Sequence, residues 1–180
     1  MNYANIKTCN IENGSGVRTC LFVSGCTHHC KNCFNREAWD FDYGAPFDAA
    51  VQQRIIDECR PSYIAGLTLL GGEPMEPDNQ RALLPFLQRY RAECGKTVWC
   101  YSGYTWEQLT GDSRGRCEVT DEILREIDIL VDGPFVEALH DITLRFRGSS
   151  NQRIIDVKQS LATGTVVLWA DKPLYSSHRM

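Results

Sequence analysis

The chain has 180 residues, 43% of them apolar and 10% aromatic, which is enough for one substantial hydrophobic core and falls in the range of a single domain. The formal net charge of -4 argues against a nucleic acid as the main partner, because nucleic-acid binding usually leaves a basic surface. No apolar run approaches the roughly 20 residues that a membrane span requires, and residues 1–8 lack the basic-then-apolar layout of a signal peptide. We therefore expect a single domain over residues 1–180, located in the cytoplasm and without a membrane partner.

Short apolar runs alternate along the chain with segments in which apolar residues recur at helical spacing. In chain order, the predicted elements are a strand at 18–24, a helix at 47–59, a strand at 67–70, a helix at 78–90 with Pro85 early in it, a strand at 97–101, a helix at 120–125, and strands at 127–132, 153–157 and 165–169. Strands that are apolar on both faces and separated by helices predict a mainly parallel sheet covered by helices. A closed eightfold α/β barrel takes about 250 residues, so this α/β chain can form only an open, partial barrel or an open sheet.

Unusual residues follow four of the predicted strands, at residues 25–34, 71–75, 102–104 and 133–135. Because the carboxyl ends of parallel strands meet at one edge of a sheet, we expect these four loops to converge there. Tyr101, Ser102, Gly103 and Asp132 are further candidates at this edge, with purely structural roles as the alternative. The glycines at 14–16 precede a strand and lack the third glycine of a dinucleotide-binding motif, so we interpret them as a flexible loop at the same edge.

Nine cysteines cannot all pair as disulfides within one chain, and without a secretory signal metal or redox chemistry is the more frequent use. Three of the nine lie within the eight residues from Cys26 to Cys33, with Cys30 between them. Thiolates hold iron–sulfur cubanes, and a four-iron cluster with three cysteine ligands has one iron free to bind a cofactor or substrate. The spacing therefore predicts Cys26, Cys30 and Cys33 as the protein ligands of one cluster.

A zinc site is the alternative use of these thiols, with His28 or His29 as a further ligand. No second pair of closely spaced cysteines or histidines completes a zinc module, so we disfavour this alternative, a non-enzymatic zinc-binding interaction module. The two histidines are predicted to be solvent-exposed loop residues that tune the cluster rather than ligate it. Three other cysteines, on apolar faces of predicted elements, are expected to be buried and free: Cys20, Cys59 and Cys100.

The order of these motifs resembles the radical S-adenosylmethionine superfamily, in which a three-cysteine loop follows the first strand and a segment like Gly71-Gly72-Glu73-Pro74 follows the second. Within that superfamily the chain resembles the enzymes that activate anaerobic ribonucleotide reductases. The segments that carry this narrower resemblance are 13–18, 22–26, 33–35, Val131-Asp132-Gly133-Pro134-Phe135 and Arg147-Gly148-Ser149-Ser150-Asn151-Gln152-Arg153. They span almost the whole chain, and they imply a partial α/β barrel of the radical S-adenosylmethionine type.

The resemblance also implies a cofactor set and a site, namely one [4Fe-4S] cluster per chain with S-adenosylmethionine on its open iron. The loop 71–74 would meet the amino group of S-adenosylmethionine, with Glu73 as an acceptor. Many members have an aromatic residue before the third cysteine, where this chain has Asn32, so adenine packing is expected from Phe34 and the backbone of 32–34. The cofactor-binding residues would be Asn32, Cys33, Phe34, Gly71, Gly72, Glu73, Ser149 and Asn151. A polar turn held by its own side chains is the alternative for the last two.

The implied reaction is reductive cleavage of S-adenosylmethionine to a 5'-deoxyadenosyl radical, which abstracts a glycine Cα hydrogen from the large subunit of the anaerobic reductase and leaves a glycyl radical. Because a carbon radical abstracts hydrogen directly, we expect no catalytic acid, base or nucleophile from the protein. An external one-electron reductant such as flavodoxin would supply the electron. Two other activities stay open as alternatives: activation of pyruvate formate-lyase, and radical chemistry on a small molecule.

Overall fold

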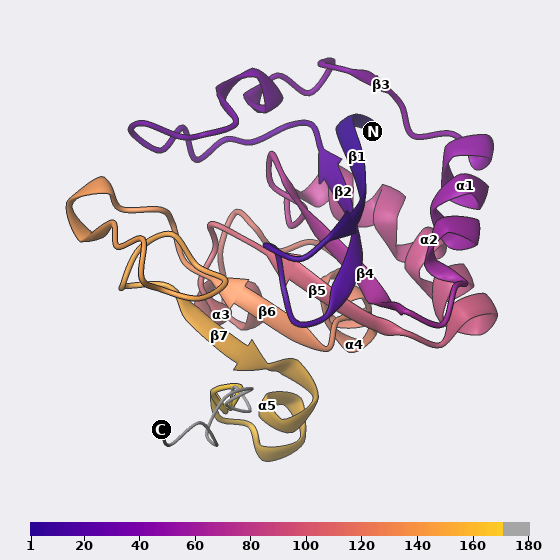
Figure 1. Cartoon of the computed structure of the whole chain (residues 1–180). Helices are drawn as coiled ribbons and strands as arrows, with labels where there is room; N and C mark the ends of the chain where they lie inside the picture. The colour runs from indigo at the N-terminus through magenta and orange to yellow at the C-terminus, as the bar shows by residue number, and fades with distance from the viewer. Residues whose placement is uncertain (171–180) are drawn as a thin grey trace, which may run out of the picture.

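The computed structural model describes residues 1–170, which form an open, mixed sheet of seven strands in the order β3-β1-β2-β4-β5-β6-β7 (Figure 1). The strands are β1 Asn2–Asn10, β2 Val17–Val23, β3 Ala45–Pro46, β4 Ile64–Gly71, β5 Thr97–Tyr101, β6 Ile129–Asp132 and β7 Arg153–Asp156. The central strands β2, β4, β5 and β6 are parallel to one another. At the two edges the pairing is antiparallel, with β1 against β2, β3 against β1, and β7 against β6.

The helices are α1 Ala49–Cys59, α2 Pro77–Cys94, α3 Trp106–Thr110, α4 Thr120–Glu126 and α5 Val157–Thr163, with short 3-10 helices η1 Arg36–Trp39 and η2 Glu137–Leu139. The main hydrophobic core joins buried residues of α1, α2 and α4 to the central strands. A smaller cluster lies apart from this core, where Trp99, Ile129 and Val131 pack with Phe146 and Trp169. None of the helices described between residues 1 and 170 has the length and apolarity needed to cross a membrane.

The structure confirms the predicted mainly parallel α/β sheet, and five of the six predicted strands lie within three residues of their observed bounds. The prediction at 165–169 is wrong, because that segment contributes only one isolated bridge, between Leu168 and Ile155. Its Trp169 instead packs against Trp99, with ring centroids 5.2 Å apart. The sequence analysis also missed β1, β3, α3 and α5, and it placed Pro85 early in a helix that begins at Pro77 and contains it in the interior.

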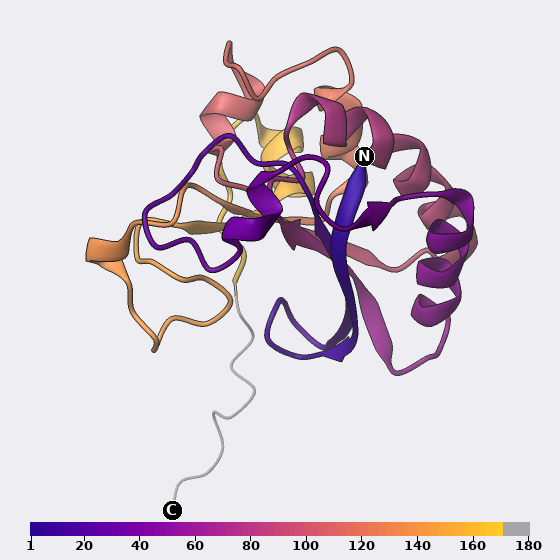
Figure 2. The ribbon, with the colours of Figure 1, turned by 90° about the horizontal axis from the view of Figure 1, so that it is seen from above.

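Since the four central strands run in the same direction, the segments that follow them lie at one edge of the sheet. Figure 2 shows the loop after β2, in purple, beside the long orange loop after β6. The two loops are in contact, because Lys31 Nζ of the first lies 3.1 Å from Glu137 Oε2 of the second. The predicted convergence of post-strand loops is therefore confirmed.

Arg18 of β2 is buried, at 1% exposure, and all five N–H donors of its guanidinium are used. The acceptors are Thr68 Oγ1, Ser15 O, Thr97 Oγ1, Thr97 O and Leu67 O, at distances from 2.7 to 3.2 Å. None of these acceptors is a carboxylate, and burial lowers the pKa of Arg18 to about 10.

The glycine loop at 14–16 packs over this buried arginine rather than lying at the cavity edge, so its predicted place was wrong. A Cβ on Gly14, whose φ is +121°, would come within 2.9 Å of both the Arg18 side chain and the Trp99 ring. The glycine is therefore required by close packing against the side chains of β2 and β5.

We expect Arg18→Met to lower the free energy of unfolding by about 2–4 kcal/mol, because it leaves several buried acceptors without donors. Urea denaturation of the protein measures the change. Arg54→Met is the matched control, since Arg54 is 55% exposed and pairs only with Glu58 on the same helix. Its effect should stay within about 0.5 kcal/mol. Equal stability of the two variants would contradict the importance of the Arg18 contacts.

Candidate metal and cofactor site

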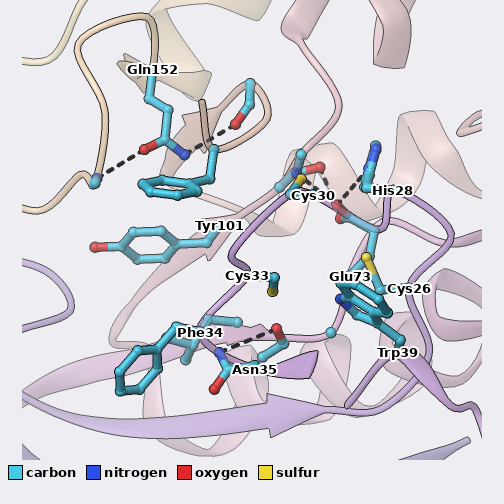
Figure 3. A pocket seen from close by; sticks show the side chains of 18 of the residues that line it. Cys26, His28, Cys30, Cys33, Phe34, Asn35, Trp39, Glu73, Tyr101 and Gln152 are labelled. Carbon is cyan, nitrogen blue, oxygen red and sulfur yellow. Dashed lines mark hydrogen bonds and ion pairs between the residues drawn. The ribbon is translucent and has the colours of Figure 1, made fainter. Parts of the chain in front are cut away.

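A cavity of about 590 Å³ lies at the edge of the sheet where the post-strand loops converge (Figure 3). Its wall contains the three cysteines of the loop after β2 together with residues 71–73, 101–103, 133 and 135 from the next three strands and their loops. Phe34 and Asn35 lie at one side of the cavity, and Gln152, from the segment before β7, lies at the other. The four predicted loops thus line one cavity.

The cysteine loop is folded by two residues in the left-handed backbone region, His29 with φ +48° and Asn32 with φ +56°. These turns, and a hydrogen bond from Cys33 N to Cys30 O of 3.1 Å, bring the three cysteines to the same cavity. Cys26 is buried at 7% exposure, and Cys30 and Cys33 are half-buried.

Burial raises the pKa of the Cys26 thiol to about 12, and burial also raises the pKa of Cys30. Such thiols are protonated at neutral pH unless a cation stabilises the thiolate. The thiols of Cys26 and Cys30 are therefore better suited to bind a cationic centre in the cavity than to act as free nucleophiles.

Glu73 joins three of the converging loops through one buried carboxylate, which is 1% exposed. Its Oε1 accepts hydrogen bonds from Met75 N and Ser102 Oγ, both at 2.8 Å. Its Oε2 accepts one from Gly103 N at 2.6 Å and lies 3.0 Å from His28 Nε2. Both oxygens therefore have partners within the protein, and the contact of Glu73 with an ammonium group that the sequence analysis expected stays a prediction.

His28 is therefore not the solvent-exposed residue that we predicted. Its side chain is only 11% exposed and packs edge-on against Tyr104, with ring centroids 4.3 Å apart. His29 is exposed, as predicted, and stacks on Trp39. Neither histidine joins the thiols, and among residues 1–170 no three His, Cys, Asp or Glu side chains are arranged to hold a single metal ion.

A second buried carboxylate holds the neighbouring residue of the cysteine loop. Glu76 Oε1 accepts hydrogen bonds from Thr27 N at 2.9 Å and Thr27 Oγ1 at 2.6 Å. Asn79 adds two more links, donating from Nδ2 to Ser24 O and to Glu73 O at 2.9 Å each. The first half of the cysteine loop is thus bound along its length to the loop after β4.

Gly71 and Gly72 line the cavity, but contacts within the chain explain why both are glycines. Gly71 has φ +110°, and a Cβ there would come within 2.7 Å of the Phe22 backbone. A Cβ on Gly72 would lie 2.6 Å from Gly25 O and 2.7 Å from Ala38 O. The two glycines allow the end of β4 and its loop to pack directly on the backbone of β2, the start of the cysteine loop and η1.

The remaining predicted cofactor residues separate into two groups. Asn32 and Phe34 line the cavity, where Asn32 Nδ2 donates to Glu137 and the Phe34 ring is 98% exposed at the cavity mouth. Ser149 and Asn151 do not line it, so the structure does not support their predicted contact with a cofactor. The Ser149 hydroxyl is buried and accepts from Val136 N at 3.2 Å.

Asn151 donates instead to Pro134 O at 2.8 Å, so both residues hold the loop after β6, as in the polar-turn alternative. The neighbouring Gln152 does reach the cavity, where its Nε2 donates to Gly133 O at 3.0 Å. Asp132 is likewise structural, since it pairs with Arg153 and accepts from Trp106 N at 2.7 Å. The remaining cysteine prediction is confirmed, because Cys20, Cys59 and Cys100 are fully buried and free.

Sequence reasoning missed Trp39, which ends η1 and lines the cavity. In residues 1–170, seven buried side-chain N or O atoms have no hydrogen-bond partner, and three of them belong to residues of the cavity wall. These three are His28 Nε2, Trp39 Nε1 and Tyr101 OH. Since His28 Nε2 lies 3.0 Å from Glu73 Oε2, Trp39 Nε1 and Tyr101 OH are the two that count as unpaired in the described cavity wall. Buried polar groups are normally paired, so this concentration indicates a cavity built around a polar or charged occupant.

Comparisons with known proteins agree with a metal centre. A family model described as "4Fe-4S single cluster domain" matches residues 12–155, which include the cysteine loop and the β4 loop. The chain is 43% identical, over 86% of its length and 96% of the relative, to a protein of Pasteurella multocida (strain Pm70) named anaerobic ribonucleoside-triphosphate reductase-activating protein. A protein of the same name from Escherichia coli (strain K12) is 41% identical, over 84% of this chain and 96% of its own length. Another, from Enterobacteria phage T4, is 34% identical, over 86% of this chain and 93% of its own length.

The contacts of Glu73 lead to a prediction that can be tested on the metal-free protein. Glu73→Gln places an amide N–H₂ against at least one N–H or O–H donor, so we expect the junction of the β4 and β5 loops to weaken by about 2 kcal/mol. The amides of Met75 and Gly103 should then exchange hydrogen roughly 30-fold faster in the metal-free protein. Glu118→Gln is the control, because Glu118 is exposed and pairs only across the surface with Arg81. Unchanged exchange at both amides would show that the carboxylate does not hold the loops together.

Proposed function

Because this chain belongs to the family of anaerobic ribonucleoside-triphosphate reductase-activating proteins, we propose that it is a radical S-adenosylmethionine enzyme that generates the glycyl radical of an anaerobic ribonucleotide reductase. The observation that carries this proposal is the convergence of Cys26, Cys30 and Cys33 on one cavity with the Gly-Gly-Glu loop. The proposal treats residues 1–180 as one radical S-adenosylmethionine domain of the partial-barrel type, acting in the cytoplasm.

The cavity residues fit a [4Fe-4S] cluster on three counts. The three thiols line one cavity, as the ligands of a single cluster must. Burial disfavours the thiolates without a cation, and an iron cluster supplies that cation. The unpaired Trp39 Nε1 and Tyr101 OH offer hydrogen bonds to an electron-rich occupant.

When bound, the cluster and S-adenosylmethionine supply the chemistry, in which one electron breaks a carbon–sulfur bond and the resulting 5'-deoxyadenosyl radical takes a glycine Cα hydrogen. The protein's own task is to hold three irons through Cys26, Cys30 and Cys33 and to leave the fourth open. Glu73 and Glu76 fix Thr27 and His28 between the first two cysteines, so the ligand spacing is set before the cluster binds.

S-adenosylmethionine would lie against the loops that share the cavity with the thiols. We assign contact with the cofactor's amino group to residues 71–73, Glu73 included. Phe34 and the backbone of Asn32 and Cys33 are the proposed adenine contacts, and the exposed Phe34 ring has room to move onto a ligand. Tyr101, Ser102 and Gly103 form the facing wall.

The substrate glycine would reach the cavity through its open mouth. A second cavity, of about 470 Å³, adjoins the first and shares Cys33, Phe34, Asn35 and Gly71 with it, extending toward Phe22. A segment of a large protein can enter such an opening, whereas a closed barrel would admit only small molecules. The reductase large subunit is therefore the proposed partner, with an external one-electron donor such as flavodoxin.

Alanine at Cys26, Cys30 or Cys33 should abolish cluster assembly, because each thiolate is proposed to hold one iron. Iron and sulfide analysis of anaerobically purified protein measures this, with about four irons per wild-type chain expected. Cys9→Ala is the control, since Cys9 is exposed, free and remote from the cavity lining. Undiminished iron in the three loop variants, or zinc in place of iron in the wild type, would refute the cluster.

The reduced protein, mixed without oxygen with S-adenosylmethionine and the cognate reductase, should produce a doublet electron paramagnetic resonance signal on the reductase. The signal should lose its splitting when the glycine Cα is deuterated. The control omits S-adenosylmethionine. If S-adenosylmethionine is cleaved while the reductase stays free of radical, and pyruvate formate-lyase or a small molecule is turned over instead, the reductase is the wrong substrate.

A further inference from the structure

Trp39 presents an unpaired hydrogen-bond donor in the wall of the main cavity (Figure 3). Its indole Nε1 is buried and has no partner among residues 1–170. An indole N–H is a donor only, so no rearrangement of its own proton can satisfy it, and a buried donor without an acceptor costs free energy. The position therefore calls for an acceptor that occupies the cavity.

The indole is held where it is by contacts on several sides. Trp39 O accepts a hydrogen bond from Cys26 N at 3.1 Å, so the residue is tied directly to the first cysteine. The His29 ring stacks on the indole with centroids 4.5 Å apart and an interplanar angle of 28°. The Arg36 guanidinium lies 5.3 Å from the indole centroid. These contacts hold the indole beside the cysteine loop in the wall of the cavity.

Sulfur is the acceptor that the cavity wall presents beside this donor. Cys26, Cys30 and Cys33 share the cavity wall with Trp39, and Figure 3 shows the indole beside Cys26. The indole N–H is thus a side-chain donor in the same wall as the three sulfur atoms. Building on the proposed function, we propose that Trp39 Nε1–H donates a hydrogen bond to a sulfur atom of the iron–sulfur cluster, whether thiolate or sulfide.

Such a bond would tune the cluster as well as help to hold it. A hydrogen bond to sulfur favours the more electron-rich, reduced cluster, and hydrogen bonds to the sulfurs are among the factors that set a cluster's reduction potential. Trp39 would therefore make the cluster easier to reduce by its external donor. Its role is distinct from ligation, because the indole offers no lone pair to iron.

Trp39→Phe tests the proposal, since it keeps an aromatic ring in the stack with His29 and removes only the N–H and the second ring. We expect the variant to retain its iron, to show a more negative cluster reduction potential in an anaerobic titration, and to cleave S-adenosylmethionine more slowly with a weak reductant. Trp169→Phe is the matched control, because Trp169 packs on Trp99 outside the cavity lining and should leave the potential unchanged.

A direct readout uses wild-type protein labelled with ¹⁵N in the tryptophan indole. Pulsed electron paramagnetic resonance of the reduced cluster should detect a coupled ¹⁵N nucleus, which Trp39→Phe removes and Trp169→Phe keeps. A cluster signal without ¹⁵N coupling in the wild type overturns the role of Trp39 while leaving the proposed function intact. Weaker S-adenosylmethionine binding in Trp39→Phe at an unchanged potential assigns the donor to the cofactor and overturns the sulfur assignment. A wild type that forms no cluster refutes the proposed function itself.

Discussion

One buried carboxylate organises the site. Glu73 sits where the loops after β2, β4 and β5 meet, and its two oxygens contact a donor from each of them. A carboxyl group with 1% exposure is tolerated only when hydrogen bonds within the protein replace those to water, so the three loops must meet around it. The positions of Ser102, Gly103 and His28 are consequences of that requirement. The contacts of the carboxylate thus hold together three of the loops that line the cavity.

The sequence predicted those parts of the fold that are buried on both faces. The strand at 97–101 matches β5 in full, because Val98 and Cys100 pack in the main core on one face and Trp99 packs in the smaller cluster on the other. By contrast, β1 is a polar, half-exposed strand between β2 and the two-residue edge strand β3, and its burial pattern does not alternate. Helix α3 has five residues, too few to show a helical period. The apolar run at 165–169 pairs with β7 only around the bridge of Leu168 to Ile155, which is too short to form a strand, and the Trp169 ring packs on Trp99.

The same holds for the site: the spacing of residues in the sequence predicts some of its features, and only the folded structure shows the others. The cysteine loop and the Gly-Gly-Glu loop could be placed together from the parallel strand order alone. The hydrogen-bond partners of the polar side chains could not be predicted, because Glu73 and Ser149 form hydrogen bonds with residues that are distant in sequence. Trp39 carries no periodic or motif signal at all. It became visible only through a donor that the folded chain leaves unpaired.

The cavity is assembled from segments far apart in the chain, so these segments leave the ribosome at different times during protein synthesis. Asn32 of the cysteine loop is in contact with Glu137, which lies 105 residues later. At translation rates of about 5–20 residues per second, the thiols leave the ribosome roughly 5–20 s before that wall can form. A nascent chain therefore carries three cysteines that the finished protein encloses, exposed to oxidants and stray metal ions. Anaerobic growth and rapid completion of the chain both shorten the period in which these thiols can be lost.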